Sequence, residues 1–260
     1  MNRFKNMVHA GEQPVGTFVG SASMLMTEAC AAAGFDYVII DNEHSPVEAE
    51  TSAQLIIAAE SKGITPFCRV REISRPAILK LLDVGAQGLI VPCVKSVDEV
   101  RKLVEYTKYA PVGQRGFCPT RKDGWGYGIS LDVQGTMSYF NDNVLLFPQC
   151  ETVEALSCIE EIAALDGVDG IFIGPFDLSI SMGIPGRFDL PEFQAALERI
   201  KNACHHAGKF CILFTMTPEG VIDGFSKGYD SMTMAIDLSI FIKSAKEALE
   251  AIGRETLNHR

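Results

Sequence analysis

The chain has 260 residues and a formal net charge of −10, from 33 acidic and 23 basic residues. This length fits one large α/β domain, and the acidic balance argues against nucleic acid and anionic membranes, which attract basic surfaces. No run approaches the roughly 18 apolar residues of a membrane span, and the first residues lack the apolar core of a signal peptide. Eight cysteines without a CxxC pair indicate reduced thiols of a cytoplasmic protein rather than a disulfide framework or zinc site.

Short apolar runs alternate with longer amphipathic segments along the whole chain. The runs lack polar alternation, as expected of parallel strands that are covered on both faces. We expect strands at residues 15–20, 37–41, 65–69, 88–92, 144–149, 170–174, 209–214 and 229–235. We expect helices at residues 22–33, 47–62, 74–84, 97–108, 152–164, 190–207, 217–227 and 238–252.

Eight strand and helix pairs without a linker predict a single (β/α)₈ TIM-barrel domain over residues 1–260. A doubly wound sheet is the alternative, but the chain has no nucleotide-binding fingerprint after a strand. The one irregular region, residues 110–140, is long and Gly-rich. Long loops in compact domains often cover active sites, so we expect a cover here, with an ordered surface loop as the alternative.

Barrel enzymes build their active sites from residues at the C-terminal ends of the strands. In this chain polar and ionisable residues gather at those positions. They are Asp41, Glu43 and His44 after the second strand, Arg69 at the end of the third, Gln149 and Glu151 at the fifth, and Gly174, Pro175 and Asp177 after the sixth.

Each of these residues suits a particular chemistry. Arg69 at the mouth fits bidentate capture of a carboxylate or phosphate, although a structural ion pair is the alternative. Asp41 is placed to hold one ring nitrogen of His44 and leave the other free to exchange protons. Glu151 and Asp177 on adjacent strands form the oxygen pair that Mg²⁺ or Mn²⁺ accepts, whereas alone each would be an ordinary acid at a helix start.

The chain resembles the class II, metal-dependent pyruvate aldolases of the HpcH/HpaI group, which includes 4-hydroxy-2-oxoheptanedioate aldolase and 2-dehydro-3-deoxyglucarate aldolase. The matching stretches are AGFDYVIIDNEHSP, LLDVGAQGLIVPCVKSVDEV, PVGQRG, PQCET and GVDGIFIGPFDLSISMG. The resemblance implies a phosphoenolpyruvate/pyruvate-type barrel that cleaves a 4-hydroxy-2-oxo acid to pyruvate and an aldehyde. It also implies a homohexamer, a trimer of dimers that exchange their last helix, here residues 238–252.

The resemblance also implies roles for individual residues. Glu151 and Asp177 would bind the divalent cation, which is Mg²⁺, Mn²⁺ or Co²⁺. His44, supported by Asp41, would be the acid/base group. Contacts to the 2-oxo acid would come from Arg69, Gln149, Gly174, Pro175 and Leu213, the last of these beside the pyruvate methyl group.

Several alternatives stay open on the sequence. Decarboxylation of oxaloacetate, as in the macrophomate-synthase type, would use the same cation and arginine. A Schiff-base aldolase would need a lysine in the mouth, for which Lys95 is the candidate, and a non-catalytic barrel that binds 2-oxo acids is a further reading. Residues 116–140 depart from the family pattern and leave the aldehyde open. Glu43 has no assigned role, and the helix-end residues His205 and His206 are expected at the surface.

Overall fold

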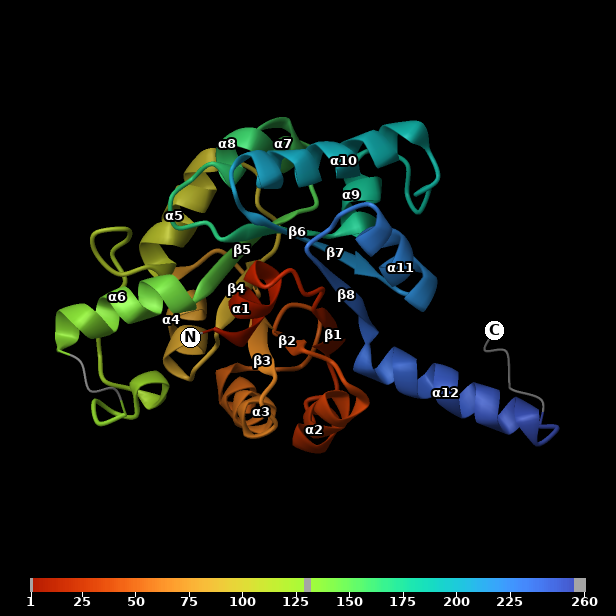
Figure 1. Cartoon of the computed structure of the whole chain (residues 1–260), viewed down its shortest axis with the longest axis horizontal. Helices are drawn as coiled ribbons and strands as arrows, with labels where there is room; N and C mark the ends of the chain where they lie inside the picture. The colour runs from red at the N-terminus through yellow and green to blue at the C-terminus, as the bar shows by residue number, and fades with distance from the viewer. Residues whose placement is uncertain (1, 129–131, 255–260) are drawn as a thin grey trace.

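The computed structural model describes residues 2–128 and 132–254. Eight parallel strands close into a barrel in the order of the chain, with helices around it (Figure 1). The strands are β1 (Val15–Val19), β2 (Tyr37–Asp41), β3 (Thr65–Arg69), β4 (Gly88–Val91), β5 (Leu145–Cys150), β6 (Gly170–Ile173), β7 (Phe210–Thr215) and β8 (Ser231–Ile236). The predicted (β/α)₈ barrel is therefore confirmed, with each strand within two residues of its expected ends.

The helices follow the strands, and three of them were not predicted. The unpredicted helices are α1 (Arg3–His9), α6 (Val133–Asn143) and α9 (Pro175–Ser181). The predicted ones are α2 (Met24–Ala33), α3 (Ala49–Ser61), α4 (Arg75–Asp83), α5 (Val97–Thr107), α7 (Val153–Ser157) with α8 (Ile159–Ala163), α10 (Pro191–His206), α11 (Pro218–Ser226) and α12 (Asp237–Ala251). Serine and threonine caps start several of them; Ser96, for example, accepts a hydrogen bond from the backbone N–H of Glu99.

Alternation along each strand divides the core into two parts. Side chains such as Ile39, Phe67 and Phe147 fill the barrel interior, whereas their neighbours Ile40 and Cys68 pack between the strands and the helices. The same alternation directs Asp41, Arg69 and Gln149 inward at the carboxyl ends of their strands, because each lies two residues beyond an interior side chain. Asp41 and Arg69 are direct register partners of β2 and β3.

The amino-terminal end of the barrel is closed by α1. Phe4 from this helix is buried, and its ring packs edge-on against Tyr37 at 5.3 Å and Phe67 at 5.1 Å between centroids. The Asn2 side chain caps α1 and also donates to the carbonyl of Gln87, just before β4. The barrel is therefore open to solutes at its carboxyl end.

The segment 110–140 does not cover the mouth of its own barrel. It contains α6, and its described residues lie near the amino-terminal ends of the strands (Figure 1). There Arg121 pairs with Glu60 and donates to the carbonyl of Val84 at 3.1 Å. The expectation was wrong because this segment joins a helix to the next strand, and such connections lie at the amino-terminal end of a barrel, whereas the loops that follow strands form the mouth. Residues 129–131 lie outside the described part.

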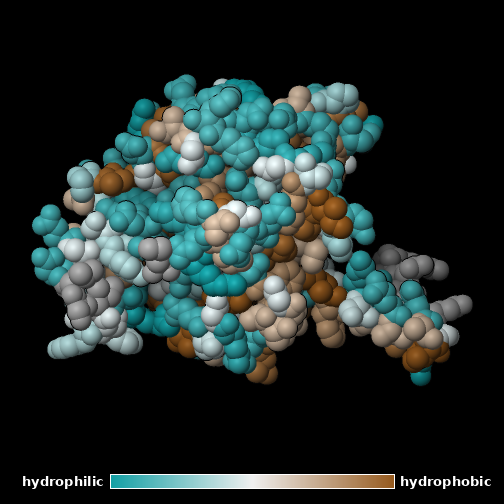
Figure 2. All heavy atoms as spheres, viewed as in Figure 1, coloured by the Kyte–Doolittle hydropathy of each residue, from teal (hydrophilic) through white to brown (hydrophobic). Residues whose placement is uncertain are grey.

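The last helix, α12, projects away from the barrel (Figure 1). Phe241 and Ile242 on this helix are more than half exposed. Hydrophobic surface is visible on the barrel side from which α12 projects (Figure 2). Leu25 of α2 and Ile222 of α11 are exposed apolar side chains. Among the described residues, none of the helices combines the length and the apolar character that crossing a membrane requires.

Candidate functional site

Asp41 organises the turn that follows β2. Its carboxylate accepts both guanidinium hydrogen bonds of Arg69, each at 2.9 Å. It also accepts from the backbone N–H groups of Glu43 and His44 and from the hydroxyl of Ser45. Burial opposes its charge, but the hydrogen bonds and charge of Arg69 lower the pKa of this carboxyl overall. Asp41 is thus an ionised anchor for both the turn and the arginine.

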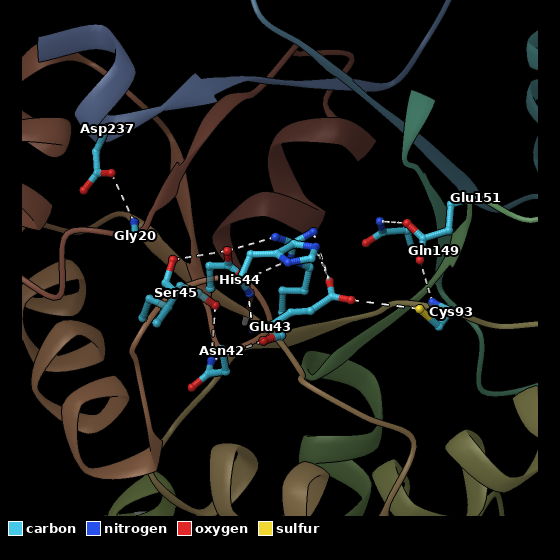
Figure 3. Close-up of polar contacts among 12 residues, drawn as sticks. Gly20, Asn42, Glu43, His44, Ser45, Cys93, Gln149, Glu151 and Asp237 are labelled. Carbon is cyan, nitrogen blue, oxygen red and sulfur yellow. Dashed lines mark hydrogen bonds and ion pairs between the residues drawn. The ribbon is translucent and has the colours of Figure 1, made fainter. Parts of the chain in front are cut away.

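The structure corrects the expected partnership of Asp41 with the His44 ring. Asp41 contacts only the backbone of His44, and the imidazole lies 3.7 Å from Glu43 instead. The His44 side chain is 67% exposed and reaches into the mouth (Figure 3). The reason is local: Asp41 faces into the barrel, where Arg69 and the turn N–H groups use its oxygens first.

Glu43 is the residue that sequence reasoning left without a role. It pairs with Arg69 at 3.1 Å, lies beside His44 and points toward Cys93 (Figure 3). Burial raises the pKa of Glu43 against the opposing charges of Arg69 and His44. The sequence signal for a role of Glu43 was its place directly before His44 in the turn. Its contact with Arg69 could not be predicted, because it depends on the pairing of β2 with β3.

Glu151 is a buried carboxylate on the opposite side of the mouth. It accepts from the backbone N–H of Cys93 at 2.6 Å and from the amide of Gln149. Burial raises the pKa of Glu151, and the nearby charges of Asp177 and Glu43 add to this rise. Both of its donors are neutral, so the ionised form lacks a countercharge from them.

Cys93 lies at the mouth rather than in the packed core. The residue is exposed at the mouth and has a φ of +58°, in the left-handed region. This conformation directs its N–H at Glu151. Burial, together with the charges of Glu151 and Glu43, raises the pKa of the Cys93 thiol to about 11, so it is a neutral thiol at pH 7.

Gly174 joins β6 to α9 and allows a close approach of backbone and side chains. A Cβ atom there would lie 2.7 Å from the Gln149 amide nitrogen and 2.9 Å from a Glu151 oxygen. Any larger residue would therefore displace the two side chains. Pro175 follows as the first residue of α9, and Asp177 lies in the first turn of this short helix.

A cavity of about 150 Å³ lies at this end of the barrel. Arg69, Gln149 and Asp177 line it, with Gly174 and Pro175. Phe18, Phe172 and Phe214 line it as well, and the Arg69 guanidinium lies 4.7 Å from the Phe18 ring centre. The lining therefore combines charged and polar groups with aromatic rings, and its size suits a small organic acid.

Leu213 lines the adjacent cavity rather than this one, and its contact with the pyruvate methyl group stays a prediction. It lies on the outer face of β7 with the core between strands and helices. Its neighbour Phe214 faces inward and borders the cavity instead. Successive residues of a strand point to opposite faces, and the sequence alone does not determine which of the two faces the barrel interior. Lys95 is exposed and does not line the cavity either.

The donor set at the mouth fits a divalent cation. Asp41, Glu43, Glu151 and Asp177 are four acids against the single arginine Arg69, and two of them already engage that arginine. The amide oxygen of Gln149 is buried without a hydrogen-bond partner. Within the described residues no cluster of three or more His, Cys, Asp or Glu side chains has metal-binding geometry. The remaining candidates are Glu151 and Asp177, which suits a hard cation that keeps waters and substrate oxygens as its other ligands.

The closed barrel and the polar residues gathered at the carboxyl ends of its strands define a (β/α)₈ fold with one candidate site at that end. The model of the HpcH/HpaI aldolase/citrate lyase family matches residues 15–244, so the chain belongs to this family and is an enzyme of the carbon–carbon lyase class. It is 31% identical over 250 residues to the 2-keto-3-deoxy-L-rhamnonate aldolase of Escherichia coli O157:H7, covering 95% of this chain and 92% of the relative.

Solved structures agree with this assignment. The HpcH/HpaI aldolase of Desulfitobacterium hafniense DCB-2 superposes with a TM-score of 0.89 at 26% identity, covering 98% of both chains. The citrate synthase SbnG superposes with a TM-score of 0.85 at 30% identity, covering 95% of this chain and 96% of the other.

Proposed function

We propose that this protein is a divalent-metal-dependent aldolase that cleaves a 4-hydroxy-2-oxo acid to pyruvate and an aldehyde, and that forms the same bond in reverse. The observation that carries the proposal is the cavity lined by Arg69, Gln149 and Asp177 beside the buried carboxylate of Glu151. In a chain of this family, such a cavity suits a small 2-oxo acid with one carboxylate.

Arg69 is the group that meets the negative charge of the donor acid. Its bonds to Asp41 and Glu43 fix the guanidinium plane against Phe18, and its remaining N–H donors are free to face the cavity. Gln149 adds its amide, and the backbone around Gly174 and Pro175 borders the place of the carboxylate. These groups are held before substrate arrives, which avoids reorganisation during the reaction.

Glu151 and Asp177 would hold the cation, which is Mg²⁺, Mn²⁺ or Co²⁺. When bound, it supplies positive charge that stabilises the enolate form of pyruvate. Gln149 and the N–H of Cys93 orient Glu151 for this task. Gly174 keeps the space beside Glu151 and Gln149 clear.

His44 is the acid/base group in this proposal. In cleavage, the base takes the proton of the C4 hydroxyl, the C3–C4 bond breaks to release the aldehyde, and C3 of the enolate then gains a proton to give pyruvate. The exposed imidazole reaches the mouth, and Glu43 at 3.7 Å is its acidic neighbour. Asp41 positions His44 through the backbone of the turn.

We also propose the assembly that the family resemblance implies, a homohexamer in which dimers exchange α12. The exposed Phe241 and Ile242 and the apolar surface of α2 and α11 support an exchange. The eight cysteines are all free and most are buried, which supports a cytoplasmic location. The expected partners are the small 2-oxo acid and the aldehyde.

Exchange of the pyruvate C3 protons with deuterium, followed by NMR, tests the donor half without any aldehyde. We expect exchange with Mg²⁺ or Mn²⁺ and loss of exchange after EDTA and dialysis. Exchange that survives removal of the metal would contradict the cation assignment. Oxaloacetate and several 4-hydroxy-2-oxo acids, assayed in parallel, separate aldol cleavage from decarboxylation, and borohydride trapping with pyruvate tests for a Schiff base.

His44→Ala should lower aldol turnover by about 100-fold or more, because general acid/base groups contribute on this scale. Binding of pyruvate with Mn²⁺, measured by calorimetry, should remain within a few-fold of the wild type. An equal loss of binding and turnover would instead make His44 a binding residue.

A further inference from the structure

We propose that the aldehyde handled by this enzyme carries an apolar chain or ring, and that this group lies in a second cavity beside the donor cavity. The inference rests on the proposed aldolase function and specifies its acceptor class. It starts from a side cavity that none of the roles assigned above uses.

The side cavity measures about 280 Å³ and lies between β7 and the helices α9, α10 and α11. Its walls are mostly apolar, with Phe188, Phe193 and Leu197 among the lining residues. Pro175, Phe176 and Phe214 line both this cavity and the donor cavity. The two spaces are therefore adjacent and share one wall.

A row of aromatic rings leads from one cavity into the other. Phe18 and Phe214 are 5.6 Å apart between ring centres, and Phe214 is 6.3 Å from Phe176. Phe176 is 5.1 Å from Phe188, which is 5.3 Å from Phe193. The row begins at Phe18, which lines the donor cavity beside Arg69. An acceptor carbon that meets C3 of pyruvate there would place its substituent along these rings.

Charged groups at the side cavity are already paired. Lys227 bonds Asp223 at 2.7 Å and the side-chain oxygen of Gln194 at 3.2 Å. An anionic tail would thus meet no free cation among these lining residues. Arg121 and Lys122 make their contacts at the other end of their own barrel, Arg121 with Glu60 and Lys122 with the carbonyl of Cys118.

The apolar lining of the cavity supports an occupant of the same character. An apolar space binds apolar molecules readily because they replace lost packing contacts and leave no polar group unpaired. We therefore expect discrimination by chain length and apolar surface rather than by hydrogen bonds.

A panel of aldehydes with pyruvate as the constant donor tests the inference. The panel comprises acetaldehyde, isovaleraldehyde, benzaldehyde, glycolaldehyde and succinic semialdehyde, with kcat/KM measured in the direction of aldol addition. We expect isovaleraldehyde and benzaldehyde to exceed acetaldehyde by about tenfold or more, and succinic semialdehyde to show no such gain.

Two variants narrow the side cavity without touching the donor cavity. Leu197→Phe acts from the buried face of α10 and Met216→Phe from the exposed rim. Each should remove most of the advantage of isovaleraldehyde and benzaldehyde and leave acetaldehyde unchanged. If Leu197→Phe fails to fold, Met216→Phe still tests the inference. Ile57→Phe, an equally exposed apolar position on α3, is the matched control.

Deuterium exchange of pyruvate, measured on every variant, separates the two proposals. Absence of exchange in the wild type overturns the aldolase function itself. Normal exchange with no preference for apolar aldehydes overturns the acceptor inference alone. An equal loss for all aldehydes in both Leu197→Phe and Met216→Phe would also overturn it, because the cavity would then have only a structural part.

Discussion

At the amino-terminal end of the barrel, Lys108 is buried, and its ammonium group donates to Asp169 at 2.8 Å and to the carbonyls of Val144 and Asn141 at 2.6 and 3.0 Å. At the carboxyl end, Glu151 is buried to a similar degree, but its hydrogen-bond donors are a backbone N–H and an amide. The first charge is neutralised within the chain and the second is not.

The difference separates stability from function within one fold. A buried charge with a full set of partners contributes to the stability of the native state only while all of those partners remain. A buried carboxylate without a cationic partner costs stability, and such a cost is common where a ligand supplies the missing charge. The amino-terminal end is therefore built for closure and the carboxyl end for binding.

Glu151→Gln tests this contrast most strongly. We expect kcat/KM for aldol cleavage to fall on the order of 1000-fold, because charge stabilisation in the site is lost. Without metal, the free energy of unfolding of the variant should be about 1 kcal/mol higher than that of the wild type, since a buried charge is removed. The Gln149 amide, whose oxygen has no partner, turns to accept from the new side chain. Activity assays and urea denaturation measure the two effects.

Addition of Mn²⁺ supplies the control for that variant. Binding to the native state alone raises the thermal midpoint of the wild type, and Glu151→Gln should show little such rise. A variant that loses stability without metal, or that keeps the full response to Mn²⁺, would remove Glu151 from the cation site.

Lys108→Met addresses the other end. The substitution keeps the length of the side chain but removes the ammonium group that donates to Asp169 and to two carbonyls, and Asp169 keeps the backbone N–H of Leu146 as a donor. We expect a loss of about 3 kcal/mol in the free energy of unfolding, with kcat/KM of the folded enzyme unchanged. Arg101→Met, at an exposed pair with Asp98 on α5, should change stability little and serves as the reference.

Asp41→Asn gives the smallest effect and carries a pH signature. The folded-state pKa of Asp41 lies below its ordinary value of 3.8, so its stabilising contribution is present above that value and is lost as the pH falls through the lower folded value. At pH 7 the free energy of unfolding of the wild type should exceed that of the variant by about 2 kcal/mol. The gap should narrow below about pH 4. A gap that stays constant down to pH 3 would show that the ion pair with Arg69 is not its source.

Much of this molecule follows from local sequence. Unbroken apolar runs such as YVIID and GIFIG predict buried parallel strands, and the glycines between helix and strand give the βα rhythm. Polar residues directly after those runs identified the mouth, because parallel strands in a barrel end at one face. The sequence therefore predicted Arg69, Gln149 and Asp177 at this end, and these three residues line one cavity there.

The tertiary structure decided the pairings. Strand register set Asp41 opposite Arg69, and so gave Arg69 rather than His44 the Asp41 carboxylate. Strand parity turned Phe214 inward and Leu213 outward, and chain path placed Arg121 of the 110–140 segment beside Glu60 at the far end of its own barrel. These features depend on contacts between residues distant in the chain. Strand and helix patterns depend on near neighbours, so they can be predicted from the sequence alone.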